Sequence, residues 1–61
     1  MNLSEKAQNE IDQAVINSNY VEDSELDIFI VAEAYKISIK YDLEQIYIEE
    51  ILQRKIMGYT E

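Results

Sequence analysis

The sequence predicts an all-α fold: a small three-helix bundle, or a helical hairpin with an extra N-terminal helix, formed by residues 1–61 as one domain. Apolar residues recur at intervals of three and four, which is the pattern of an amphipathic helix. The chain contains no proline and a single glycine, Gly58, so the turn residues typical of β-hairpins are missing. A chain of 61 residues has room for one small core.

The first helix is expected at about residues 4–17. Ser4 stands where its hydroxyl group can cap the first turn. The polar run Asn-Ser-Asn at residues 17–19 ends the helix. An apolar stripe at three-four spacing predicts the buried face, formed by Leu3, Ala7, Ile11, Ala14 and Val15.

The second helix is expected at about residues 24–41. Ser24 and Asp27 resemble a capping box, with Asp23 as an alternative cap. Its apolar residues are too many for one stripe, so this helix must be covered on more than one side. Any apolar area that stays uncovered is expected to be an interface. The strict alternation in YKISIKY, residues 35–41, leaves a two-strand element as the alternative.

The third helix is expected at about residues 42–57. Asp42 and Gln45 have the spacing of a capping box, and Gly58 stands where a left-handed C-terminal cap is expected. Cations in the last turn, Arg54 and Lys55, complement the negative helix end. The predicted inward face consists of Leu43, Ile46, Tyr47, Ile48, Ile51, Leu52 and Ile56.

The charge of the chain is strongly acidic, with 13 acids against 5 bases and a net charge of −8. Such a chain repels a phosphate backbone. Four acids lie between residues 21 and 27: Glu22, Asp23, Glu25 and Asp27. They are either an acidic patch that meets a basic surface, or acids that collect at a helix start because its positive end favours them.

Direct binding of nucleic acid is not expected, although residues 35–55 resemble a helix-turn-helix motif. The small and apolar positions of that motif are matched by Ser38, Tyr41, Leu43, Ile48 and Ile51. The helix face that would meet DNA instead carries Glu44, Gln45, Glu49 and Glu50. Carboxylates on that face would repel phosphate.

Catalysis is not expected either. The chain has no cysteine and no histidine, no serine with an evident base, and no glycine-rich phosphate loop, so we predict no enzyme activity and no cofactor. Residues 21–27 lack the ligand spacing of a calcium loop, so no metal site is predicted. The absence of a signal-like start and of a long apolar run predicts a cytoplasmic protein without a membrane span.

Residues 24–58 resemble a known family. The shared features are a Glu25-Leu26 opening, Ala34, Asp42, a Glu50-Ile51 pair, Arg54 and the closing Gly58. With these residues the segment resembles the helical hairpin of the Sda family of sporulation proteins, which inhibit a sensor histidine kinase. Residues 1–23 have no counterpart there. The resemblance implies two packed helices and inhibition of a kinase by binding.

The function expected from the sequence is that of a small acidic interaction module that binds and modulates, most simply inhibits, a regulatory protein such as a transcription factor or signalling kinase. A phage or mobile element is a possible source of such a protein. The alternative is an acidic DNA mimic that occupies the DNA site of a repressor, nuclease or repair enzyme.

A homo-oligomer, preferably a dimer, is expected because the core is small. The predicted partner-binding residues are Glu22, Asp23, Glu25, Asp27, Ile28, Tyr35, Tyr47, Glu49 and Glu50. The five tyrosines could act as interface anchors. For Tyr35, Tyr41 and Tyr47 the preferred interpretation is a place at the rim of the core with the hydroxyl group in water.

Overall fold

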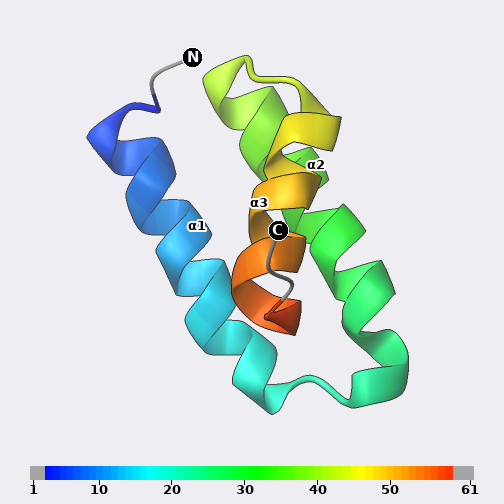
Figure 1. Ribbon diagram of the computed structural model, residues 1–61. Helices are drawn as coiled ribbons and strands as arrows, with labels where there is room; N and C mark the ends of the chain where they lie inside the picture. The colour runs from blue at the N-terminus through cyan, green and yellow to red at the C-terminus, as the bar shows by residue number, and fades with distance from the viewer. Residues whose placement is uncertain (1–2, 59–61) are drawn as a thin grey trace.

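The computed structural model describes residues 3–58, which form a bundle of three helices (Figure 1). These are α1 (Glu5–Asn17), α2 (Leu26–Tyr41) and α3 (Gln45–Met57). Two short 3-10 turns, η1 (Ser18–Tyr20) and η2 (Asp23–Glu25), connect α1 to α2. Residues 3–58 contain no β-strand, so the all-α prediction is confirmed and the strand alternative for residues 35–41 is wrong.

The start of α1 follows from the capping residue predicted for it. The hydroxyl oxygen of Ser4 accepts a 3.1 Å hydrogen bond from the backbone N–H of Ala7. At the other end, the Ser18 hydroxyl group donates a 2.6 Å hydrogen bond to the carbonyl oxygen of Val15. The cap at Ser4 satisfies a donor that has no partner within the helix.

The corner between α2 and α3 is built on a left-handed residue. Asp42 has φ 55° and ψ 52°, and its N–H donates to the carbonyl oxygen of Ser38. The N–H of Leu43 donates to the same oxygen at 2.9 Å. Together these two bonds end α2 and turn the chain, as a left-handed helix C-terminus does.

Both predicted capping boxes are wrong. Asp42 belongs to the end of α2, so residues 42–44 are a connection, and the Gln45 side chain donates to Glu49 at 2.8 Å. At the start of α2 the N-cap position is Glu25, which makes no side-chain cap bond, because residues 23–25 form η2. Gly58 does adopt the predicted left-handed cap, with φ 73°.

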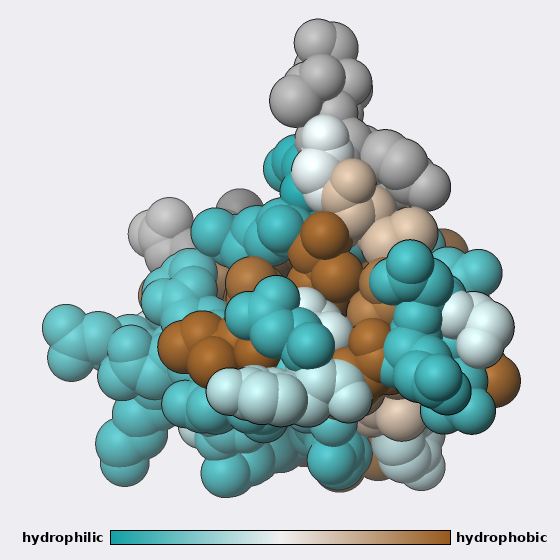
Figure 2. Space-filling view, turned by 90° about the horizontal axis from the view of Figure 1, so that it is seen from below, coloured by the Kyte–Doolittle hydropathy of each residue, from teal (hydrophilic) through white to brown (hydrophobic). Residues whose placement is uncertain are grey.

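The core lies where the three helices meet. In Figure 1, α3 lies between α1 and α2, and it packs most extensively against α2. Figure 2 looks at the end of the bundle that carries the α1–α2 connection, and shows hydrophobic residues at its centre with hydrophilic residues around them. The buried cluster draws on all three helices: Ile11, Ala14, Ile30, Ala34, Ile37, Ile48 and Leu52.

The predicted inward faces of α1 and α3 are confirmed, with one exception. Ala7, Ile11 and Ala14 are buried, and Leu3 and Val15 are half-buried. On α3, Ile46 is 67% exposed, so its assignment to the inward face is wrong. Helical geometry explains this, because Ile46 lies about 160° around the helix from the buried Ile48.

Candidate functional site

The second helix presents apolar side chains to solvent. Successive intervals of three and four residues place them on one side of α2, opposite the core residues Ile30, Ala34 and Ile37. The neighbouring helices therefore leave one side of α2 uncovered. We call this surface the α2 apolar band: Ile28 (71% exposed), Val31 (45%), the exposed Ala32, Tyr35 (55%) and Ile39 (63%).

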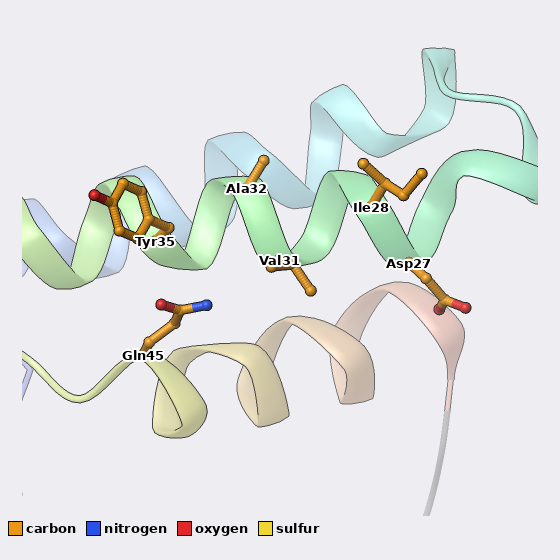
Figure 3. Close-up of a pocket in the computed structure, with 6 residues that line it drawn as sticks. All are labelled: Asp27, Ile28, Val31, Ala32, Tyr35 and Gln45. Atoms are coloured by element: carbon orange, nitrogen blue, oxygen red, sulfur yellow. The ribbon is translucent and has the colours of Figure 1, made fainter.

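A shallow, open depression of about 490 Å³ runs along most of the band (Figure 3). Ala32, the smallest of the lining residues, lies between Ile28 and Tyr35 along the helix. Gln45, from the first turn of α3, points toward Tyr35 and closes one end. The complete lining is Asp27, Ile28, Val31, Ala32, Tyr35 and Gln45.

Acidic side chains mark the N-terminal end of the band. Asp27 lines the depression, and three further acids precede it in η2 and the connection. All four are exposed, and none of them has an ion pair or side-chain hydrogen bond within residues 3–58. Their charge is therefore available to another molecule. The four are Glu22, Asp23, Glu25 and Asp27.

The structure brings three of the predicted partner-binding residues into one lining: Asp27, Ile28 and Tyr35. Tyr47 is half-buried and packs against the core. On α3, Glu50 is exposed, whereas Glu49 is half-buried and accepts the hydrogen bond from Gln45. Adjacent helical positions point about 100° apart, which separates these two carboxylates.

The sequence prediction did not include Val31, Ala32 and Gln45 among the partner-binding residues. For Val31 and Ala32 a signal was present, since they continue the three-four spacing from Ile28 to Tyr35. Gln45 carried no such signal. Its place beside α2 depends on the turn between α2 and α3.

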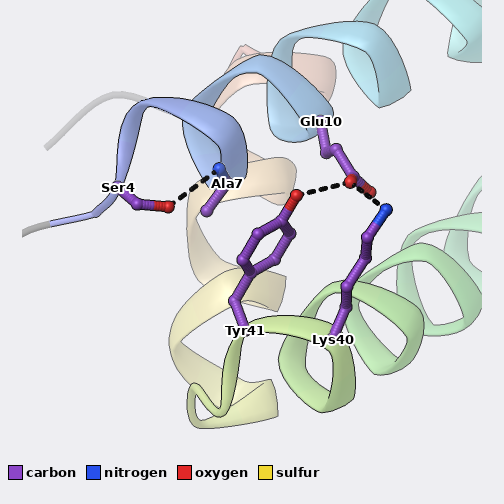
Figure 4. A network of polar contacts seen from close by, with 5 residues as sticks. All are labelled: Ser4, Ala7, Glu10, Lys40 and Tyr41. Atoms are coloured by element: carbon purple, nitrogen blue, oxygen red, sulfur yellow. Dashed lines mark hydrogen bonds and ion pairs between the residues drawn. The ribbon is translucent and has the colours of Figure 1, made fainter.

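A polar network joins α1 to the end of α2 (Figure 4). The Tyr41 hydroxyl group donates to a Glu10 carboxylate oxygen at 2.6 Å, and Lys40 Nζ lies 2.6 Å from the same oxygen. Tyr41 therefore lies at the rim of the core, and its hydroxyl group has a partner in Glu10. The hydrogen bonds from Lys40 and Tyr41 lower the pKa of Glu10, and the same contacts raise the pKa of Lys40 and of Tyr41. Because it holds α1 against the side of α2 away from the band, the network is structural.

Other kinds of site are not evident within residues 3–58. No helix in this part of the chain is both long and apolar enough to cross a bilayer. The carboxylate groups of these residues form no cluster that could hold a metal ion. Comparisons with protein-family models, curated proteins and solved structures found no match.

Proposed function

We propose that this chain is a small non-enzymatic interaction module that binds a regulatory protein and inhibits it through the α2 apolar band. The supporting observation is the exposure of Ile28 and Tyr35, which the chain's own core does not use. Contiguous apolar surface of this kind marks an interaction site more often than a plain surface. A helix that lays such a face into a groove is a recurring mode of recognition.

The chemistry of the band defines the groove that fits it. The exposed side chains of Ile28 and Tyr35 would each fill an apolar pocket in the partner's groove. Tyr is also enriched among the residues that dominate binding energy. The four acids at the N-terminal end favour a partner with basic residues at one end of its groove. Such charges set the orientation and speed of docking.

The class of partner is a transcription factor or a signalling kinase. The resemblance of residues 24–58 to the Sda hairpin supports the kinase, because α2 and α3 form two packed helices over the same residues. A module without catalytic groups inhibits by occupying a surface that its target needs. In a kinase this would be a surface used during phosphoryl transfer, and in a transcription factor one used for dimerisation or DNA binding.

The proposal is tested by affinity capture from the native host with quantitative mass spectrometry. The bait variants are Ile28→Asp and, as a matched control, Ile46→Asp, which changes a similarly exposed isoleucine outside the band. We expect a regulatory protein that the wild type and Ile46→Asp capture and that Ile28→Asp loses at least tenfold. The captured protein is then purified and assayed with and without the chain. Equal capture by both variants, or an unchanged activity, contradicts the proposal.

A DNA mimic is the second candidate, and the four unpaired acids favour it. Carboxylates of this kind would attract a DNA-binding surface over a long range, so the affinity would fall steeply with salt. The test is a variant with four substitutions. Glu22 and Glu25 are changed to Gln, and Asp23 and Asp27 are changed to Asn. If this variant loses the captured protein and Ile28→Asp keeps it, the acidic surface is the site and the band is not.

A further inference from the structure

We infer that a second copy of this chain covers the α2 apolar band, with the two α2 helices antiparallel and related by a twofold axis at the middle of the band. In a twofold interface each residue meets a counterpart and is met by it in return. Four of the five band residues, Ile28, Ala32, Tyr35 and Ile39, are spaced by four, three and four residues, which reads the same in both directions. An antiparallel pair therefore brings Ile28 opposite Ile39, and Ala32 opposite Tyr35.

The sizes of the paired side chains also match. Ala32 lines the depression of about 490 Å³, and Tyr35, which lines it too, is 55% exposed. In the antiparallel pair, the ring of Tyr35 from each copy enters the depression over Ala32 of the other copy. Large residues opposite small ones are what close packing between two helices requires.

The band is accessible to a second helix. The core side chains of α2 point away from it, toward α1 and α3. Neither neighbouring helix covers the band, apart from Gln45 at one end of the depression. Two helices pack with their axes about 8–10 Å apart, and a small residue such as Ala32 at the crossing point permits that approach.

Charge selects the antiparallel orientation. Residues 22–27 carry four acids and no base, whereas residues 36–41 carry two lysines and no acid. Antiparallel helices keep the two acidic ends apart, and place each at the level of Lys36 and Lys40, which pair with Glu33 and Glu10 of their own chain. A parallel pair would place the acidic ends together, and its helix dipoles would also repel. The net charge of −8 on each copy opposes association, so salt should strengthen the dimer.

This dimer would regulate the proposed docking site, and that consequence rests on the proposed function. The band cannot contact a second copy and a regulatory protein at once. The partner therefore binds the monomer, and self-association withholds the docking surface at high concentration.

The first test is sedimentation equilibrium of the purified full chain over a range of concentration and salt. We expect a dimer that tightens as salt rises. Tyr35→Ser should raise its Kd at least tenfold, whereas Tyr20→Ser, at an 87% exposed tyrosine outside the band, should leave it unchanged. Circular dichroism checks that both variants fold. A wild type that stays monomeric at millimolar concentration, or equal effects of the two variants, overturns the inference.

The second test determines orientation by disulfide formation. The chain has no cysteine, so introduced thiols react only with each other. Positions 28 and 39 are about 16 Å apart along a helix, and a disulfide needs Cα atoms within about 7 Å. We expect mixed Ile28→Cys and Ile39→Cys chains to form a disulfide-linked heterodimer, and each chain alone to remain reduced. Cross-linking of each variant with itself, at the rate of the mixture, overturns the antiparallel pairing.

The two proposals can fail separately. A wild-type dimer whose Ile28→Asp variant still captures the regulatory protein leaves the dimer standing and removes the proposed docking site. If instead the wild type is monomeric and its Ile28→Asp variant loses that protein, the proposed docking site stands and the dimer is removed.

Discussion

The hydroxyl group of Tyr41 donates a 2.6 Å hydrogen bond to the carboxylate of Glu10, and thereby joins the last residue of α2 to α1 (Figure 4). Lys40 lies 2.6 Å from the same oxygen, so one carboxylate receives two contacts from the end of α2. Hydrogen bonds to an ionised acceptor are stronger than those between neutral groups.

Removal of either partner in this network should lower thermal stability. We expect Tyr41→Phe and Glu10→Gln each to lower the Tm by a few degrees, because each change breaks a hydrogen bond between α1 and α2. The double variant should lose less than the two single losses together, since both remove the same bond. Thermal unfolding followed by circular dichroism measures all four proteins. Strict additivity would show that the two groups do not interact.

The same network predicts a dependence of stability on pH. The hydrogen bonds from Lys40 and Tyr41 lower the pKa of Glu10 below its ordinary value. Its stabilising effect is therefore complete above the ordinary glutamate pKa and is lost as the pH falls through the lowered value. The Tm difference between the wild type and Glu10→Gln should shrink between about pH 7 and about pH 3. A difference that stays constant over this range contradicts the pKa shift.

At alkaline pH the stability contributed by the network depends on pH in the opposite direction. The hydrogen bond to Glu10 raises the pKa of Tyr41, so the neutral phenol is favoured in the folded chain. The stabilisation is complete below the ordinary tyrosine pKa and is lost as the pH rises through the raised value. Spectrophotometric titration of the tyrosines should show one group that titrates later in the wild type than in Glu10→Gln.

The left-handed residue at the α2–α3 corner should respond to glycine. Asp42 has φ 55°, a conformation that costs a residue with a Cβ atom about 1 kcal/mol and glycine almost nothing. We expect Asp42→Gly to stabilise the chain by about 1 kcal/mol, which raises the Tm by about 4–8 °C in a domain of this size. Asp42→Val should destabilise it by a similar amount. A lower Tm for the glycine variant would show that the aspartate side chain stabilises the corner.

Two isoleucines on α3 should differ sharply in their importance to stability. Ile48 is fully buried and Ile46 is 67% exposed, although they lie two positions apart. Ile48→Ala leaves a cavity and should cost about 2–5 kcal/mol, enough to unfold much of so small a domain. Ile46→Ala should change the free energy of unfolding by less than about 0.5 kcal/mol. Chemical denaturation measures both, and similar losses would contradict the orientation of α3.

Local chemistry explains the parts of the fold that could be predicted. The Ser4 cap, the Gly58 cap and the buried stripe of α1 each depend on residues within a few positions of one another. The capping predictions that failed involve competition between neighbouring elements. Asp42 could have begun α3 by its residue type, but the bonds from its own N–H and that of Leu43 to Ser38 assign it to the end of α2.

By itself, the sequence determined that this chain is helical, acidic and richer in apolar residues on its second helix than one buried stripe needs. Helix periodicity and composition are properties of short segments, so they can be read without knowledge of distant contacts. The tertiary structure alone decided which side of α2 stays exposed, that Gln45 borders its depression, and that Tyr41 meets Glu10 across 31 positions. These features depend on how each helix is rotated about its axis when the bundle packs, and that rotation is set by the fit of all three helices together.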